Sequence, residues 1–265
     1  MGGRRNGSGP PGIMVLLAAV MLGFFLLPLA GLLARAPWSD AVAQLGSEGV
    51  LTAFRISLVT ATAAALLGLL FGFPLAWILA RARFRGKGLI RALVLLPMVL
   101  PPVVGGVALL TAFGRRGLLG GALAAIGVRL PFSIAGAILA ATFVSAPFLI
   151  LTLEAGIASS DRRLEEAAAT LGAGRWRVMR TILLPSIRPS LVAGAALAWA
   201  RAIGEFGATI TFAGNFPGRT QTVPLAVYET LQTDFHGAIL LSLILLAVSL
   251  GALVLLRGRR GSRWA

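Results

Sequence analysis

The sequence predicts an all-α integral membrane protein with six transmembrane helices and one long cytoplasmic loop. Of its 265 residues, 57% are hydrophobic and only 12% are charged. Soluble domains are typically about 45–50% apolar and about 25% charged, so the composition indicates that lipid solvates much of the surface. The length of the apolar segments and the placement of the basic residues predict the same fold class.

Six segments are long and apolar enough to cross a bilayer as helices. A helix needs about 20 apolar residues to span a hydrocarbon core of about 30 Å. The second segment is long enough to tilt, or to begin outside the membrane as an interfacial helix. The predicted spans are residues 13–33, 50–80, 89–113, 132–155, 190–212 and 238–256.

Two of these spans contain residues that alter helix geometry or packing. Pro97, Pro101 and Pro102 fall within the third span and predict a kink or break there, because proline removes a backbone donor and clashes with the preceding turn. In the second span, Gly68 and Gly72 form a G-x-x-x-G pair that suits close helix packing. Such pairs also arise by chance in spans rich in glycine.

The basic residues alternate between the two sides of the membrane in unequal numbers. Short loops rich in Lys and Arg stay on the cytoplasmic side, so we expect both termini to face the cytoplasm. In that orientation seventeen basic residues lie inside, five lie outside and two fall within spans. The inner residues are Arg4, Arg5, Arg81, Arg83, Arg85, Lys87, Arg91, Arg162, Arg163, Arg175, Arg177, Arg180, Arg188, Arg257, Arg259, Arg260 and Arg263; the outer ones are Arg35, Arg115, Arg116, Arg129 and Arg219; Arg55 and Arg201 lie in spans.

The predicted spans divide the chain into one membrane domain with two polar ends. We expect a disordered basic N-terminus over residues 1–12, a single membrane domain over residues 13–256 and a basic cytoplasmic tail over residues 257–265. Arg4 and Arg5 precede an apolar run, as in a secretory signal. The run is of full length, however, and no small-residue cleavage pattern follows Pro28, which predicts an uncleaved first span.

The net charge of +15 does not indicate nucleic-acid binding. The charge lies in short clusters between apolar runs and does not follow one face, as a nucleic-acid footprint would. The chain has no cysteine, which excludes disulfides and thiolate metal ligands. His236 falls in a predicted outer loop without partners at ligand spacing, so we predict no metal site. No nucleophile and base are paired, and we predict that the chain is not an enzyme.

The loop over residues 156–189 is patterned like folded structure. Asp161 suits the start of a helix, and Glu165 and Glu166 lie near its positive end. Gly172 suits a left-handed helix terminus. We expect Pro185 to end a second helix by forcing the residue before it out of the helical region. Short helices of this kind could dock into a groove on a partner protein, or rest on lipid headgroups as a basic interfacial helix.

Seven residues of this loop resemble the EAA loop of ABC-importer permeases, at that family's spacing. They are Glu166, Ala167, Ala168, Gly172, Ile182, Leu184 and Pro185. The resemblance implies a type I ABC importer permease fold, in which this loop forms coupling helices that sit in a cleft of a cytoplasmic ABC ATPase. It implies that Glu166 faces the rim of that cleft, that Ala167 and Ala168 allow close approach, and that Gly172 forms the bend between the helices.

No phosphate-binding G-x-x-x-x-G-K-[ST] loop occurs in the chain. An importer driven by ATP would therefore bind its nucleotide on a separate ATPase subunit, and we predict no cofactor for this chain.

Residues 201–234 resemble the corresponding stretch of molybdate permeases, and to a lesser degree that of sulfate and thiosulfate permeases. The resemblance implies an importer of a tetrahedral oxyanion into the cytoplasm by alternating access, with molybdate as the first candidate and sulfate, thiosulfate or tungstate as alternatives. It further implies a homodimer of this chain in the lipid bilayer of a bacterial or archaeal inner membrane. ATPase subunits would lie beneath the homodimer, and a substrate-binding protein would lie outside.

Arg201 and Glu205 are charged residues within the fifth predicted span. A charge at mid-membrane costs about 2.5–3.5 kcal/mol on the insertion scale, so neither is expected to face lipid. Their i, i+4 spacing places both on one helix face, where they can pair. The pair could lock the fifth span to its neighbours, or lie by the translocation path or its gate. A dianion would be repelled by Glu205, which is therefore expected to neutralise Arg201 and not to coordinate substrate.

Three other polar residues of the spans are less specific. Thr209 and Thr211 could donate hydroxyl hydrogen bonds to an oxyanion, or serve helix packing. Glu154 ends the fourth span near the cytoplasm, where we expect it to be solvated.

Two other classes of protein share part of this pattern. A self-contained secondary transporter or channel needs no ATPase, but it predicts internal repeats and more polar residues within the membrane than this chain has. A membrane scaffold without a transport role would need neither the EAA-like loop nor the Arg201–Glu205 pair.

Overall fold

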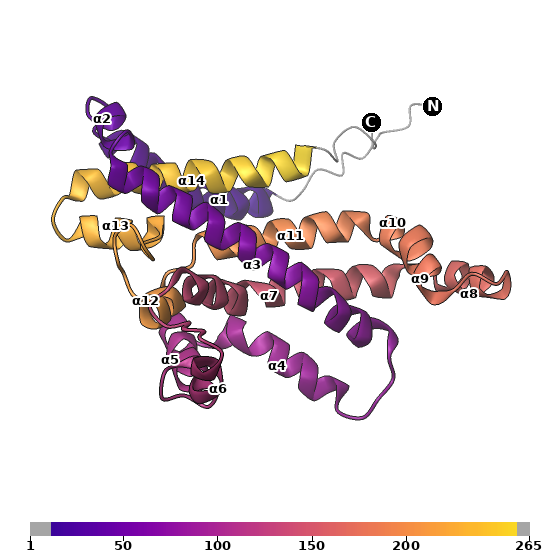
Figure 1. The fold of residues 1–265 in the computed structure, drawn as a ribbon. Helices are drawn as coiled ribbons and strands as arrows, with labels where there is room; N and C mark the ends of the chain where they lie inside the picture. Colours follow the sequence, from indigo (N-terminus) through magenta and orange to yellow (C-terminus); the bar gives the residue numbers. More distant parts are fainter. Residues whose placement is uncertain (1–11, 259–265) are drawn as a thin grey trace, which may run out of the picture.

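The computed structural model describes residues 12–258, and within that range the secondary structure is entirely helical (Figure 1). The predicted N-terminal segment (residues 1–11 of it) and the tail from residue 259 lie outside the described residues. The elements are α1 (Gly12–Arg35), α2 (Ala41–Leu45), α3 (Glu48–Arg81), α4 (Lys87–Val99), α5 (Pro102–Phe113), α6 (Gly120–Ala125), α7 (Ile134–Ser159), α8 (Arg162–Thr170), α9 (Arg175–Val178), the π-helix η1 (Met179–Leu183), α10 (Leu184–Ser186), α11 (Arg188–Ile203), α12 (Gly207–Ala213), α13 (Val223–Leu231) and α14 (Phe235–Gly258).

The number of possible membrane spans agrees with the six that the sequence predicts. By length and composition, α1, α3, α7 and α14 can each cross a membrane alone. Two bent pairs bring the number to six if each counts as one span. These pairs are α4 with α5, bent by 119°, and Arg175–Ser186 with α11, bent by 71°.

The third predicted span is broken between α4 and α5. Leu100 has φ −65° and ψ 136°, the extended conformation that a residue before proline prefers. The following Pro101 and Pro102 cannot supply the amide donors of a continuing helix. With a bend of 119°, α5 turns back instead of continuing the direction of α4. The predicted kink is therefore a reversal of the chain.

The fifth predicted span is also interrupted, where the sequence predicts a continuous helix over residues 190–212. The helix α11 ends at Ile203, and α12 begins at Gly207. Between them Phe206 has φ −126° and ψ −58°, which is not helical. Glycines on both sides, Gly204 and Gly207, weaken the helix at this point.

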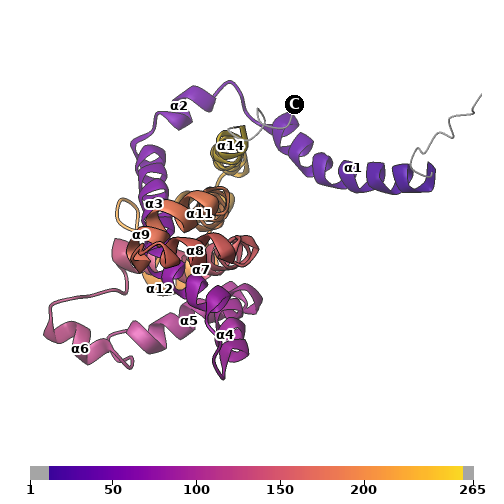
Figure 2. The same ribbon diagram turned by 90° about the vertical axis from the view of Figure 1, so that its right-hand side faces the viewer.

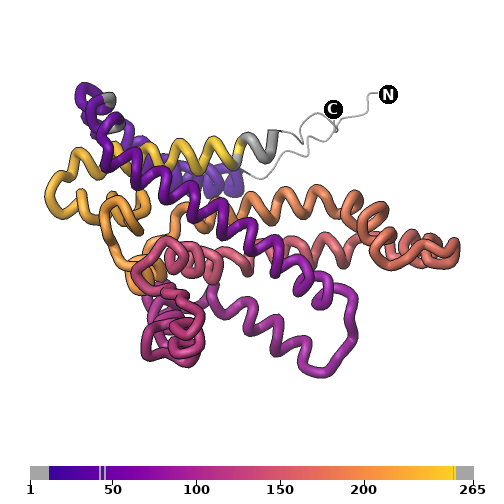
Figure 3. The backbone as a smooth tube through the Cα atoms, viewed as in Figure 1, coloured from indigo at the N-terminus to yellow at the C-terminus, as the bar shows by residue number. Residues whose placement is uncertain are grey.

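Helices α3, α7 and α11 pack together through small side chains at the centre of the molecule. Ala61 and Ala64 of α3 lie against Ala141 of α7 and Ala202 of α11. Farther along α3, a methyl group on Gly72 would lie 3.0 Å from Ile150 Cγ1, whereas one on Gly68 would lie 3.9 Å from Leu149 Cδ1, so only Gly72 of the predicted G-x-x-x-G pair serves close packing. Figures 1 and 3 show α3 crossing over α7 and α11, as these contacts require.

The two ends of the helix bundle correspond to the two predicted sides of the membrane. The connection between α3 and α4 and the helices α8 and α9 lie at one end, where the sequence predicts inner loops (Figure 1). The helices α2 and α13 lie at the other end, where it predicts outer ones.

Helix α1 extends away from the rest of the molecule, as Figure 2 shows, and none of its residues is buried. Just beyond its end, Ala36 packs with Ile239 and Leu240 of α14. A continuous apolar surface of this length is typical of contact with a membrane or with another protein.

Two side-chain expectations were wrong. His236 lies in the first turn of α14, not in a loop, because Asp234 accepts a hydrogen bond from its backbone N–H (3.0 Å) and so caps the helix. Glu154 is buried, not solvated, and forms an ion pair with Arg91 of α4. The packing of α4 against α7 brings Arg91 to Glu154, and the sequence alone does not indicate this contact.

Candidate functional site

The 156–189 loop begins with a helix whose two ends match the sequence prediction. Asp161 caps α8, its carboxylate accepting a hydrogen bond from the Arg163 backbone N–H (2.9 Å). Gly172 follows the helix with φ +83°, the left-handed conformation that glycine adopts without strain. These two residues fix the length of α8 and the direction in which the chain leaves it.

The second half of the loop differs from its prediction at Pro185. Leu184 stays helical, with φ −59° and ψ −43°, and Pro185 lies within α10. The turn before it is a π-helix, in which the Leu184 N–H bonds to the Met179 carbonyl oxygen, five residues back. In an α-helix the proline ring clashes with the carbonyl of the residue four positions earlier. The wider π-turn shifts this carbonyl away from the ring. The chain bends only at Ile187, which has φ −93° and ψ 4°.

The seven motif residues divide between the surface and the base of the loop. Glu166, Ala167, Gly172 and Pro185 are exposed, whereas Ala168, Ile182 and Leu184 are half-buried. Leu184 packs against the core formed by Leu153, Ile157, Leu183 and Ile187. The last part of the motif therefore fastens the loop to α7, and the first part stays accessible.

Large apolar side chains are also exposed on this loop. Leu164, Leu171 and Trp176 face outward, and Leu171 is 88% exposed. The guanidinium of Arg180 lies 4.5 Å from the centre of the Trp176 ring, a cation–π contact. Exposed apolar residues next to the accessible motif residues are typical of an interaction site.

The two neighbouring glutamates of α8 have different partners. Glu165 forms an ion pair with Arg81, the last residue of α3. Glu166 pairs with Arg162 of its own helix at 3.0 Å, and both of these side chains are more than 60% exposed. The sequence predicts only that Glu165 lies near the start of a helix. It does not predict the ion pair, because Arg81 is 84 residues away.

Arg201 and Glu205 form the ion pair that their spacing predicts, with 2.7 Å between Arg201 Nη1 and Glu205 Oε2. The Glu205 side chain is 2% exposed and that of Arg201 is 30% exposed. The other carboxylate oxygen of Glu205 accepts a hydrogen bond from the Ala208 N–H (2.9 Å). Glu205 thus joins the end of α11 to the first turn of α12 across the break.

The break between α11 and α12 touches the break between α4 and α5. A methyl group on Gly207 would lie 2.5 Å from Pro102 Cβ, and one on Gly106 would lie 2.5 Å from Thr211 Cβ. The backbones of α5 and α12 approach closely because these two positions are glycine.

Of the two candidate threonines, Thr209 is buried, and the Thr211 hydroxyl donates to the Gly207 carbonyl oxygen (2.9 Å). In this conformation Thr211 therefore serves its own helix.

A third polar cluster, missed by the sequence reasoning, holds the segment between α12 and α13. The Glu229 carboxylate accepts hydrogen bonds from Asn215 Nδ2 (2.8 Å) and Gln221 Nε2 (2.6 Å). Nearby, the rings of Phe206 and Tyr228 lie 5.0 Å apart, so the break after α11 also contacts α13. These partners are eight or more residues apart, and only the folded chain brings them together.

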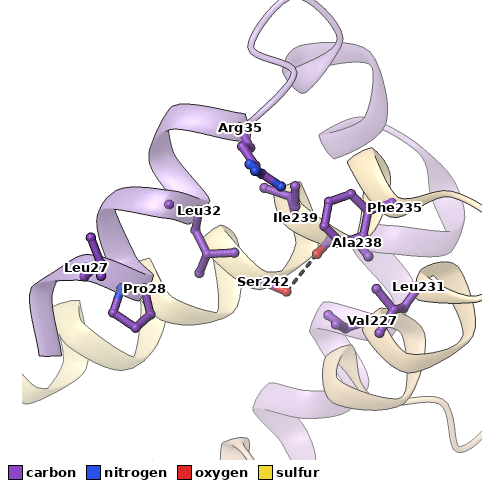
Figure 4. A pocket seen from close by; sticks show the side chains of 11 residues that line it. Leu27, Pro28, Leu32, Arg35, Val227, Leu231, Phe235, Ala238, Ile239 and Ser242 are labelled. Atoms are coloured by element: carbon purple, nitrogen blue, oxygen red, sulfur yellow. Dashed lines mark hydrogen bonds between the residues drawn. The ribbon is translucent and has the colours of Figure 1, made fainter. Parts of the chain in front are cut away.

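A cavity of about 460 Å³ lies between α1, α13 and α14 (Figure 4). Its lining is apolar except for Arg35 and Ser242, and the Ser242 hydroxyl donates to the Ala238 carbonyl oxygen. None of the candidate path residues lines it. It is a groove beside the peripheral helix α1, separate from the Arg201–Glu205 pair.

Comparison with known proteins identifies the family. Residues 68–259 match the family described as "Binding-protein-dependent transport system inner membrane component". The chain is 46% identical over 233 residues to the "Molybdenum transport system permease protein ModB" of Mycobacterium tuberculosis, covering 88% of each chain. It is 37% identical over 231 residues to the "Probable sulfate transport system permease protein cysT" of Chlorokybus atmophyticus, covering 85% of this chain and 80% of that protein.

The fold is shared with solved ABC transporters. The crystal structure of a bacterial alginate ABC transporter, in complex with an alginate pentasaccharide-bound periplasmic protein, contains a chain that matches with a TM-score of 0.75. The match covers 95% of this chain and 94% of that chain at 20% sequence identity, a likeness of fold. The family match covers residues 68–259, and the alignment to the Mycobacterium tuberculosis relative covers 88% of each chain. The family is one of transport components, not enzymes. The chain therefore belongs to the family of inner membrane components of binding-protein-dependent transport systems.

Proposed function

We propose that the chain is the permease subunit of an ATP-driven importer that carries molybdate into the cytoplasm. The observation that carries the proposal is the identity of 46% over 88% of the chain to a molybdenum transport permease. A sulfate transport permease is 37% identical, which makes sulfate the second candidate. A secondary transporter is a weaker candidate, because the family consists of components of binding-protein-dependent systems.

In this proposal the 156–189 loop binds the ATPase subunits. Its exposed side chains Glu166, Ala167, Leu171 and Trp176 offer an acidic group, a close approach and apolar contact area, which together suit a groove on a protein partner. ATP would be bound by that partner and no cofactor by this chain. The remaining partners are a second copy of the chain and an external substrate-binding protein. Both termini would lie in the cytoplasm.

The substrate path is proposed to pass the junction of the two broken spans. Broken helices commonly form substrate sites in membrane transporters, and here the breaks meet beside the Arg201–Glu205 pair. A dianion is attracted by Arg201 and repelled by Glu205. Separating the pair during alternating access would expose the positive charge to the anion, and re-forming it would release the anion.

The test is uptake of radiolabelled molybdate and sulfate into liposomes that contain this chain, its ATPase and its binding protein. Wild type is compared with Glu166→Arg, which reverses the charge at an exposed position of the loop. ATP-dependent molybdate uptake that is lost in the variant supports both the substrate and the loop. A preference for sulfate changes the anion and keeps the importer. Uptake that is independent of ATP contradicts the proposal.

A further inference from the structure

We propose that the Arg81–Glu165 pair is the connection through which the 156–189 loop moves the end of α3, and so couples ATP hydrolysis to transport. The proposal rests on the function proposed above and adds a positioning role to two residues that lie outside the motif. It predicts that breaking the pair leaves the ATPase bound and active but uncouples its hydrolysis from uptake.

The geometry of the Arg81–Glu165 pair supports this role. Arg81 is the last residue of α3, a 34-residue helix that is long enough to cross the membrane. Its Nη2 atom donates to Glu165 Oε1 in the first turn of α8 and to Ser160 Oγ (2.7 Å) at the end of α7. One guanidinium thus joins three segments: the membrane helix α3, the end of α7 and the loop helix α8.

Both side chains of the pair are largely buried. The Arg81 and Glu165 side chains are only 13% and 19% exposed. An exposed ion pair is screened by water and contributes about 0–1 kcal/mol, whereas removing one partner of a desolvated pair is costly because a charge is left without its partner. The connection is therefore expected to persist while the loop moves.

The neighbouring ion pair of α8 differs from the Arg81–Glu165 pair. Glu166 bonds to Arg162, and both residues belong to α8, so that pair cannot transmit a displacement to another element. Successive residues of a helix point in directions about 100° apart. The Glu165 side chain therefore points to α3, and the exposed Glu166 side chain is available to contact the ATPase. The two acidic residues of α8 have separate roles.

A displacement of Arg81 leads to α4. The connection after α3 has five residues, 82–86, and α4 begins at Lys87. Arg91 of α4 forms an ion pair with Glu154 of α7, so α4 is also held at this end of the molecule. At its other end α4 stops at the break at Leu100, two residues before Pro102, which contacts Gly207. A displacement of Arg81 therefore acts on α4, the helix that leads to the junction of the broken spans.

The experiment measures coupling in the complete reconstituted transporter. Arg81→Gln and Glu165→Gln remove the pair, and the double variant Arg81→Glu with Glu165→Arg restores it with the charges exchanged. Arg83→Gln is the matched control, since Arg83 is an exposed arginine two residues farther along. Three quantities are measured for each variant: co-purification of the ATPase, the ATP hydrolysis rate, and molybdate uptake per ATP hydrolysed.

We expect the single variants to keep the ATPase bound and to hydrolyse ATP, while uptake per ATP falls by about fivefold or more, the lower end of typical coupling between sites. The exchanged pair is expected to restore most of the uptake, and Arg83→Gln to match wild type. Unchanged uptake per ATP in both single variants overturns the proposal. A loss that the exchanged pair does not restore also overturns it, because it indicates a general structural role.

If the single variants do not assemble with the ATPase, the double variant Arg81→Glu with Glu165→Arg tests the proposal. A double variant that assembles and couples uptake to ATP hydrolysis supports the proposal, and one that assembles without coupled uptake overturns it. Failure of the underlying function is recognised separately. In that case the wild-type transporter itself shows no ATP-dependent uptake. If only this inference fails, the wild type is active and Arg81→Gln has the same uptake per ATP hydrolysed as the wild type.

Discussion

Gly207 of α12 lies so close to Pro102 of α5 that a methyl group on Gly207 would be 2.5 Å from the proline Cβ. Each residue belongs to the first turn of a helix that begins after a break in a predicted span. The contact therefore joins two interruptions that are about 100 residues apart in the sequence. Each break leaves backbone groups without helical partners, and placing them in contact within the protein keeps irregular backbone away from lipid.

We expect Gly207→Ala to destabilise the protein by about 1–3 kcal/mol, the usual cost of overpacking a tight contact. Gly204→Ala is the control in the same break. A methyl group there would have its nearest neighbour, the Ala200 carbonyl oxygen, at 3.9 Å, which is ordinary contact. The free energy of unfolding of both variants is measured in mixed micelles with increasing SDS. Equal stability of the two would show that the contact with Pro102 is not tight.

The Glu205 side chain should couple energetically to Arg201. We expect Arg201→Met and Glu205→Met each to lower stability, and the double variant to lower it by less than the sum. Removing both charges leaves no unpaired charge in a site where Glu205 is 2% exposed, although either loss of Glu205 also removes the acceptor of the Ala208 N–H. Double-mutant cycles in SDS unfolding should give an interaction energy of about 0.5–3 kcal/mol.

The exposed pair Arg162–Glu166 provides the matched cycle. Its spacing is also i, i+4, but both side chains are more than 60% exposed, and such pairs contribute about 0.3–0.5 kcal/mol. An Arg201–Glu205 interaction no larger than this would contradict a specific role for the buried carboxylate.

Local features of this chain were predictable from sequence because their causes are local. Apolar length gave the helices that can cross a membrane, the prolines near residue 100 gave the break, and Asp161 and Gly172 gave the ends of α8. The spacing of Arg201 and Glu205 gave their ion pair. In each case the determining atoms lie within a few residues of one another.

Contacts between distant segments were not predictable. The ion pairs Arg81–Glu165 and Arg91–Glu154 join residues 84 and 63 positions apart, and no local pattern distinguishes these arginines from the other arginines near them. Pro185 was mispredicted for a different reason: the preceding π-turn accommodates the proline ring within the helix, and Leu183 and Ile187 around it pack against α7. Tertiary contacts override the local preference there.

The orientation in the membrane can be tested by cysteine labelling, because the chain contains no cysteine. Arg116→Cys and Arg163→Cys place single thiols at exposed positions on the predicted outer and inner sides. In intact spheroplasts, a membrane-impermeant maleimide should label position 116 only. Position 163 should become reactive after permeabilisation. The reverse pattern would invert the topology and would place the 156–189 loop where no cytoplasmic ATPase can reach it.

The apolar part of the 156–189 loop should contribute to ATPase binding. Leu171 is 88% exposed, so Leu171→Glu removes no packing within the chain and should leave its stability unchanged. A charge in the centre of a protein contact is costly, and we expect the affinity of the solubilised permease for its ATPase to fall about tenfold or more, equivalent to about 1.4 kcal/mol. Leu118→Glu is the control, since Leu118 is 90% exposed in the predicted outer connection between α5 and α6.

The same variant distinguishes a protein-binding loop from one that rests on lipid. If Leu171 contacts headgroups, Leu171→Glu should leave ATPase affinity at the wild-type value, because the substitution then acts only on membrane contact. If Leu171 contacts the ATPase, affinity should fall in detergent micelles, where no bilayer is present. Measuring the affinity in micelles and again in nanodiscs with neutral lipids separates the two. A loss of similar size in both supports protein contact, and wild-type affinity in both supports contact with lipid.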